Sequence, residues 1–172
     1  MHPNENSNHR ATAKLEAEGK MHNVFVYGTL KSGYSNNVLL KGSTFKSTGI
    51  TLRLFTVLSS GFPVAFVTER PKHRLSGEVY QVDDKILAQL DRLESNGSMY
   101  KRRRVVINTP TGTEVCWMYI GVYRHWAYSF KHMPEISVVN GIYRWGPNEP
   151  TEQSKIEPPK RRSRIVEGPP AS

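Results

Sequence analysis

Short apolar runs separated by turn-forming residues dominate the middle of the chain and predict a strand-rich domain. The first run, 24–27, is continuous and ends at Gly28, which is typical of a buried strand entering a tight turn. A Gly-Phe-Pro turn at 61–63 separates two runs that are rich in β-branched and aromatic residues. Strands are therefore predicted at 24–27, 51–58, 64–68, 77–82 and 142–145.

The longest predicted strands form a hairpin in the second half of the chain. Residues 100–108 and 113–123 are rich in residues that favour strands, and the segment 109–112 between them has the sequence Thr-Pro-Thr-Gly. Two such runs around a Pro/Gly turn indicate an antiparallel pair.

A different periodicity predicts the main helix at 85–93. Its apolar residues at 86, 87, 90 and 93 recur at the spacing of one helical face, and Asp83 or Asp84 can cap the first turn. A shorter helix is predicted at 36–41 with Ser35 as its cap. Because strands lie both before and after the main helix, we expect an α+β fold: a small mixed or antiparallel β-barrel or curved sheet with a few helices. A doubly wound parallel sheet is less consistent with this order.

Composition divides the chain into three parts. We expect a flexible arm at 1–21, a folded domain at 22–147, and a disordered, Pro-rich and basic tail at 148–172. No apolar stretch approaches the roughly 18 residues of a membrane helix, and no secretory signal is visible. The expected location is therefore the cytoplasm, with no membrane partner.

The formal net charge is +9, from 24 basic and 15 acidic residues. The arm has no net charge and the tail has an excess of one, so an excess of eight falls on the predicted domain. Four consecutive cations, Lys101, Arg102, Arg103 and Arg104, contribute to it. They are interpreted either as a patch for an anionic partner or nucleic acid, or as a solvated edge strand, on which Arg102 and Arg104 share one face and Lys101 and Arg103 the other.

Glu94 is the most informative side chain. With about 100° per residue, it falls about 80° from Ile86, inside the apolar stripe of the main helix. If the helix continues that far, a carboxylate faces the core, loses hydration and acquires a raised pKa suited to acid/base catalysis. If the helix ends at Leu93, Glu94 turns into solvent instead.

The segment Tyr27-Gly28-Thr29-Leu30 is the second candidate site. A strand that stops at glycine exposes backbone N–H groups without a ladder partner, and such groups bind anions. An ordinary strand-to-loop turn explains the same residues.

Other familiar chemistries have no sequence support. The six histidines show no metal-binding spacing, and the serine-hydrolase elbow motif is absent. The single cysteine, Cys116, lies in an apolar strand and is expected to be a buried, inert thiol that forms no intramolecular disulfide.

Taken in order, these short motifs resemble the γ-glutamylcyclotransferase-like family, in its γ-glutamylamine cyclotransferase and AIG2-like branch. The resemblance covers roughly 120 of the 172 residues. It rests on Val24-Phe25-Val26-Tyr27-Gly28-Thr29-Leu30-Lys31-x-Gly33, Asn36 or Asn37, Gly61-Phe62-Pro63, Gly77-Glu78-Val79-Tyr80, Leu90-Asp91-x-Leu93-Glu94 and Tyr100-x-Arg102.

The resemblance implies a small barrel with a cavity at one end and a reaction without a cofactor. In that reaction a γ-glutamyl substrate cyclises to 5-oxoproline and releases an amine or amino acid. By resemblance, Glu94 is the general acid/base, the Tyr27–Leu30 loop binds the γ-glutamyl group, and Tyr100 and Tyr119 are cavity walls. The alternative is a catalytically silent member that binds anions or nucleic acid through 101–104. The leaving group and the oligomeric state stay open.

Overall fold

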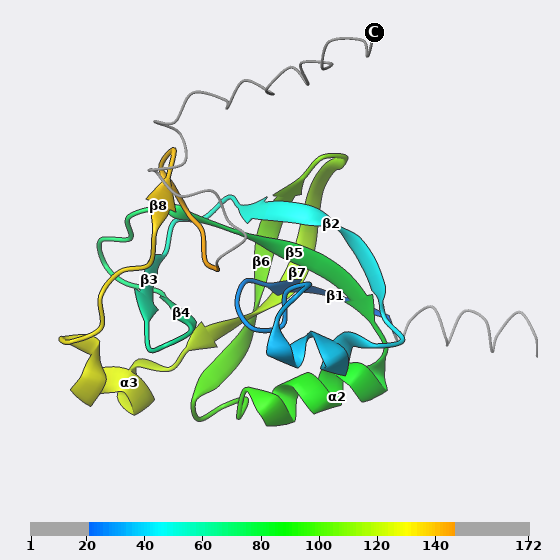
Figure 1. The fold of residues 1–172 in the computed structure, drawn as a ribbon, viewed down its shortest axis with the longest axis horizontal. Helices are drawn as coiled ribbons and strands as arrows, with labels where there is room; N and C mark the ends of the chain where they lie inside the picture. Colours follow the sequence, from blue (N-terminus) through cyan, green and yellow to red (C-terminus); the bar gives the residue numbers. More distant parts are fainter. Residues whose placement is uncertain (1–20, 147–172) are drawn as a thin grey trace, which may run out of the picture.

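The computed structural model describes residues 21–146, so the predicted tail and all of the predicted arm except Met21 lie outside the described residues. Strands predominate, with a 3₁₀ helix, η1, and two α-helices in this range (Figure 1). The elements are β1 (His22–Val26), η1 (Ser35–Leu40), β2 (Thr44–Thr51), β3 (Thr56–Ser59), β4 (Pro63–Phe66), β5 (Arg74–Val82), α2 (Asp84–Leu93), β6 (Tyr100–Thr109), β7 (Gly112–Gly121), α3 (Tyr123–Phe130), β8 (Val138–Val139) and β9 (Ile142–Tyr143).

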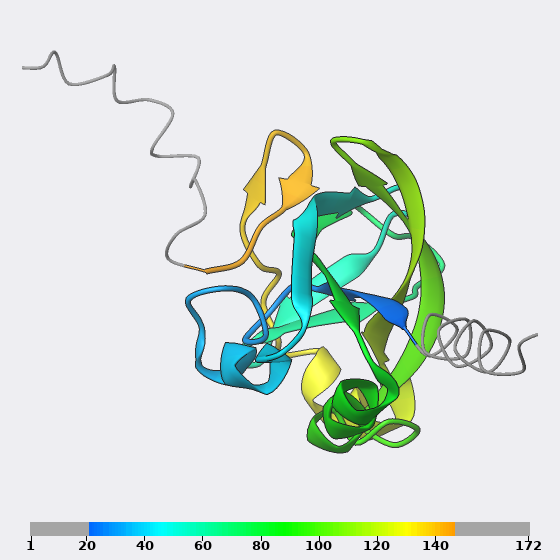
Figure 2. The same ribbon diagram turned by 90° about the vertical axis from the view of Figure 1, so that its right-hand side faces the viewer.

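Five strands close into a small barrel in the order β1-β7-β6-β2-β5, and β5 pairs back to β1 (Figures 1 and 2). The β1–β7 pair is parallel, while the other four pairs of the ring are antiparallel. The expected mixed barrel with few helices is confirmed. Although β6 lies between β7 and β2 in the sheet order, its pairs with β2 involve only Ile107 and Asn108. The four cations pair with β7 alone, so this segment is an edge, as one of the two interpretations expected.

The continuous apolar run at the start of the domain is explained by burial on both faces of β1. Val24 and Val26 join a cluster beneath α2, whereas Phe25 and Tyr27 join a second cluster with Val79. Successive side chains of a strand point to opposite faces, so a strand that is covered on both sides needs apolar residues throughout.

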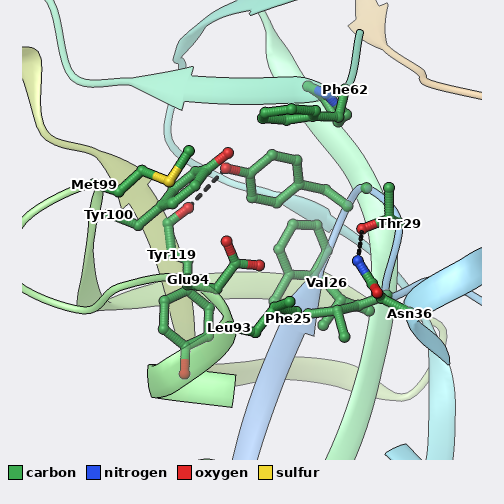
Figure 3. A pocket seen from close by; sticks show the side chains of 14 residues that line it. Phe25, Val26, Thr29, Asn36, Phe62, Leu93, Glu94, Met99, Tyr100 and Tyr119 are labelled. Carbon is green, nitrogen blue, oxygen red and sulfur yellow. Dashed lines mark hydrogen bonds between the residues drawn. The ribbon is translucent and has the colours of Figure 1, made fainter. Parts of the chain in front are cut away.

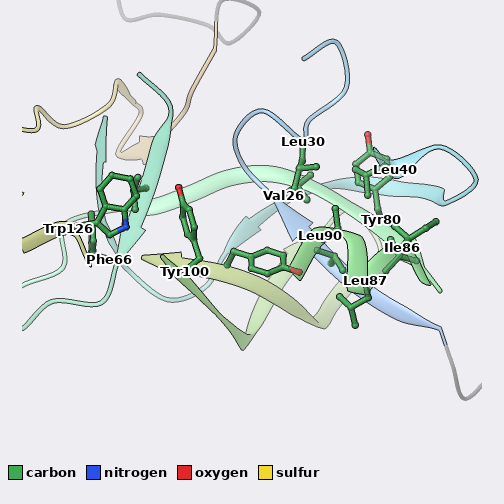
Figure 4. Packing of buried hydrophobic residues seen from close by; sticks show 14 of the residues in the cluster. Val26, Leu30, Leu40, Phe66, Tyr80, Ile86, Leu87, Leu90, Tyr100 and Trp126 are labelled. Atoms are coloured by element: carbon green, nitrogen blue, oxygen red, sulfur yellow. The ribbon is translucent and has the colours of Figure 1, made fainter. Parts of the chain in front are cut away.

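Helix α2 forms where the periodicity predicted it. The Asp83 side chain caps the helix by accepting a hydrogen bond from the backbone N–H of Ile86 at 2.8 Å. Ile86, Leu87 and Leu90 are buried against the barrel (Figure 4). Each such side chain contributes roughly 1.5–3 kcal/mol by leaving water, and this packing fixes the position of the helix's C-terminus.

The hairpin of β6 and β7 also matches the prediction, with Gly112 at a φ of +131° in the turn. Elsewhere the sequence was less informative. The predicted strand at 51–58 is wrong, because β2 ends at Thr51 and β3 begins at Thr56. β2 itself gave little signal, since only two of its eight residues are buried.

Two further corrections concern helices. Ser35 is the first residue of η1 instead of its cap, which is Tyr34 and has no side-chain capping bond. Helix α3 was not predicted, although its apolar residues at 123, 126, 127 and 130 recur at helical spacing; the predicted strand at 113–123 ran into its first residue. The final predicted strand is confirmed as β9, which pairs with β5 in parallel. Among the described residues, no helix is long and apolar enough to cross a membrane.

Candidate active site

A cavity of about 210 Å³ opens where the end of β1, the C-terminus of α2 and the starts of β4 and β6 meet (Figure 3). It contains every residue that the sequence predicted as catalytic or substrate-binding. The lining consists of Phe25, Val26, Tyr27, Gly28, Thr29, Leu30, Asn36, Phe62, Pro63, Leu93, Glu94, Met99, Tyr100 and Tyr119.

Glu94 reaches this cavity although α2 ends one residue earlier. Its backbone N–H still donates to the carbonyl of Leu90 at 2.9 Å, so Glu94 continues the last helical turn as the C-cap. Its side chain therefore keeps the angular position of the apolar stripe and points into the cavity (Figure 3). The alternative that a helix ending at Leu93 would send Glu94 into solvent is wrong.

The Glu94 carboxyl group has no hydrogen-bond or ion-pair partner among residues 21–146. Burial raises its pKa from 4.5 to about 7. Such a group exchanges a proton easily near neutral pH, because both protonation states are populated. Of the described carboxyl groups, this is the one whose pKa is raised while it faces a cavity.

The loop that follows β1 forms the wall beside Glu94. The backbone N–H groups of Gly28, Thr29 and Leu30 donate to no acceptor within the described part of the chain. Two asparagines position this loop: Asn36 donates to Thr29 Oγ1 and Asn37 to the carbonyl of Leu30, both at 2.8 Å. A fixed loop with unpaired N–H groups is suited to binding an anionic or carbonyl oxygen.

Gly28 brings this loop close to the turn between β3 and β4. A Cβ atom added at Gly28 would lie 3.1 Å from Cγ of Pro63, which also lines the cavity. The absence of a side chain therefore sets the width of the cavity at this point.

Hydrogen bonds hold two of the three tyrosines that line the cavity, Tyr27 and Tyr119. The Tyr27 hydroxyl donates to the carbonyl of Tyr119 at 2.7 Å and accepts from the N–H of Ala65 at 3.2 Å, so it serves as a structural brace. Tyr119 donates to Asp91 at 2.7 Å, and Asp91 is paired with Arg102 at 2.8 Å. Burial raises the pKa of Tyr27, Tyr119 and the third tyrosine, Tyr100, well above 10, which keeps their hydroxyl groups protonated.

The cavity also contains residues to which sequence reasoning assigned no role. Phe62 belongs to a motif that was read only as a turn, and Leu93 only as part of the helical stripe. No sequence pattern pointed to Met99, because it lies in the irregular segment between α2 and β6. These three apolar side chains line the cavity around Glu94 from different sides (Figure 3).

The four cations of β6 separate as strand alternation predicted, and none lines this cavity. The guanidinium groups of Arg102 and Arg104 lie 4.3 and 4.4 Å from the ring of Trp117, on one face. Lys101 and Arg103 line a different cavity, on the other face. Cys116 is buried as expected, and burial raises its pKa to about 11. Within 21–146, no group of His, Cys, Asp and Glu could hold a metal ion.

The described residues form a small closed barrel with one unpaired carboxyl group in a cavity. This arrangement is that of an enzyme site suited to proton transfer. The chain belongs to the gamma-glutamyl cyclotransferase, AIG2-like family, whose model matches residues 24–135. The resemblance inferred from the ordered motifs is thereby confirmed.

Individual relatives agree with this assignment. The gamma-glutamylaminecyclotransferase of Bos taurus is 36% identical over 114 residues, which cover 60% of this chain and 68% of the relative. The troponin C-akin-1 protein of Drosophila melanogaster is 34% identical over 108 residues, covering 56% and 64%. The crystal structure of an AIG2-like protein from Mus musculus matches with a TM-score of 0.57 and 26% identity, covering 76% of this chain and 98% of that one. The family and the name of the Bos taurus relative indicate a γ-glutamyl cyclotransferase-type enzyme.

Proposed function

We propose that the protein cyclises a γ-glutamyl substrate to 5-oxoproline, with Glu94 as the general acid/base. One observation carries the proposal: the unpaired Glu94 carboxyl group faces a small cavity and has a pKa raised to about 7 by burial. The name of the Bos taurus relative supports the same reaction class.

The proposed reaction forms one C–N bond, breaks another, and moves two protons from the α-nitrogen to the leaving nitrogen. The ionised Glu94 removes the first proton from the α-ammonium group, and the resulting amine attacks its own γ-carbonyl carbon. Glu94 gives this proton to the leaving nitrogen as the tetrahedral intermediate collapses and the bond to that nitrogen breaks. The ring nitrogen then loses its second proton through Glu94 to the departing amine, which leaves as an ammonium ion. The products are 5-oxoproline and a free amine, and the enzyme returns to its starting state without a cofactor. Holding the glutamyl chain in a folded conformation supplies much of the acceleration, because the attack is intramolecular.

The loop at 27–30 is proposed to bind the γ-glutamyl group. Its N–H groups would donate to the substrate's α-carboxylate or to the oxygen that becomes negative during the attack. The rings of Tyr100 and Tyr119 would confine the chain between this loop and Glu94.

The apolar side chains of Phe62, Leu93 and Met99 in the lining favour one kind of leaving group. A leaving amino acid would bring a carboxylate against these side chains and lose its hydration, whereas an alkyl amine would bury apolar surface there. We therefore expect γ-glutamyl-alkylamines to be better substrates than γ-glutamyl amino acids.

The test measures 5-oxoproline from a panel of γ-glutamyl-amines and γ-glutamyl amino acids. Glu94→Gln should lower kcat by about 10²–10⁴-fold, the usual contribution of a general acid/base. Glu69→Gln makes the same chemical change at an exposed position outside the cavity and should retain full activity. Production of no 5-oxoproline by the wild-type protein would favour the catalytically silent alternative, and full activity of Glu94→Gln would refute the role of Glu94.

A further inference from the structure

A second cavity, of about 570 Å³, lies beside the hairpin of β6 and β7 and is lined by cations. Arg53, from the connection between β2 and β3, faces it together with Lys101 and Arg103 of β6. None of the lining residues carries a carboxylate. The cavity shares no lining residue with the one that contains Glu94.

The three cations have no anionic partner in the described structure, although the Arg53 guanidinium lies over the ring of Phe55 at 5.8 Å. Arg102, their neighbour on β6, is paired with Asp91, but Arg53, Lys101 and Arg103 form no ion pair within 21–146. Like charges that gather around one concave surface repel one another, and the low-dielectric wall focuses their positive potential. An anion would relieve this repulsion.

The geometry of the cations also favours one class of anion. Two guanidinium groups present planar forks that match phosphate oxygens in pairs, and the Lys101 ammonium adds a point charge. Tyr123 lines the same cavity with 61% of its surface exposed, and its ring packs edge-on against Phe130 at 5.4 Å. An exposed ring held by a neighbouring side chain can stack on an aromatic group of a ligand.

We propose that this second cavity binds a phosphate-bearing small molecule, with Arg53, Lys101 and Arg103 on its phosphate oxygens and Tyr123 against its organic part. A diphosphate group has enough negative charge and enough oxygens to meet all three cations. The site is separate from the proposed catalysis and does not depend on it.

Calorimetric titration of the full chain with pyrophosphate and with ADP at about 0.15 M salt, where distant charges are screened, tests this proposal. Saturable binding of one molecule per chain is expected for both probes. Arg53→Gln and Arg103→Gln should each weaken binding by about tenfold, since each removes a charge-assisted pair. Arg103→Lys keeps the charge but loses the planar fork, so it should weaken binding by a smaller, measurable factor. Tyr123→Ala should weaken the binding of ADP but not of pyrophosphate, which separates the organic from the inorganic source of phosphate.

The matched control is Arg104→Gln. It removes the same charge from the next residue of the same strand, but on the opposite face against Trp117. Binding should change less than about twofold in this variant, because its cation lies outside the cavity.

Three outcomes would overturn the proposal. One is the absence of saturable binding of either probe below about 1 mM. Another is an equal loss in Arg103→Gln and Arg104→Gln, which would show a response to net charge alone. The third is an oligonucleotide that binds more tightly than either probe with a steep salt dependence, which would indicate a nucleic-acid surface instead. Thermal unfolding of each variant verifies that the fold is retained.

Discussion

The buried carboxyl group of Glu94 should make the protein less stable as the pH rises, and Glu94→Gln should remove this effect. Burial raises the pKa of Glu94 to about 7 from 4.5. At low pH the group is protonated in both the folded and the unfolded chain and adds no pH dependence. Between pH 4.5 and 7 the unfolded chain loses the proton first, so the folded state binds more protons and stability falls with pH.

The size of the effect follows from the pKa. One pKa unit corresponds to about 1.4 kcal/mol, so the difference between the folded and unfolded pKa would change the free energy of unfolding by about 3 kcal/mol. Because part of the side chain stays in contact with solvent, we expect about 2–3 kcal/mol. Glu94→Gln should therefore resemble the wild type at pH 4.5 and exceed its free energy of unfolding by that amount at pH 8. The gain should level off above pH 7, where both states of the wild type are ionised.

Urea denaturation of both proteins from pH 4.5 to 8.5 measures this difference directly, since the titration of other groups cancels. Glu69→Gln is the control and should show no such divergence, because its carboxyl group is exposed. A Glu94→Gln difference that is independent of pH would refute the desolvation of Glu94. The same pKa predicts that wild-type kcat/KM rises with pH to an inflection near 7, as the base becomes ionised.

Three further predictions concern the surroundings of the cavity. Gly28→Ala should raise KM several-fold with little loss of stability, because the added Cβ would lie 3.1 Å from Pro63 and narrow the cavity beside the 27–30 loop. Unchanged kinetics of this variant would contradict the tight contact. Asp91→Asn should lower the free energy of unfolding by about 1–2 kcal/mol, since it leaves the largely buried Arg102 guanidinium without its anion, and a neutral effect in urea denaturation would show that the pair adds nothing. Cys116 should react with a thiol reagent at pH 8 only in denaturant, because the thiol is 1% exposed and has a pKa of about 11; rapid labelling of the folded protein would disprove its burial.

Several elements follow from local sequence alone. The apolar spacing and the Asp83 cap were sufficient for α2, because a helix is defined by contacts within a few residues. The β6–β7 hairpin was equally local, since its turn and both strands are contiguous. By contrast, β2 is mostly solvent-exposed and lacked the hydrophobic pattern on which such predictions depend. Helix α3 has apolar residues at helical spacing, but it is short and follows a long strand, and the predicted strand extended into it.

The sequence by itself determined that one carboxylate lies within an apolar stripe and that four consecutive cations alternate across a strand. It did not determine what surrounds them. Glu94 acquires its raised pKa because the barrel brings the 27–30 loop, Phe62 and Tyr119 around it from distant parts of the chain. In the same way, only the closed sheet decided that Arg102 has a partner while Arg103 faces an open cavity. Desolvation and charge pairing depend on long-range packing, and local periodicity carries no information about which residues will meet across the barrel.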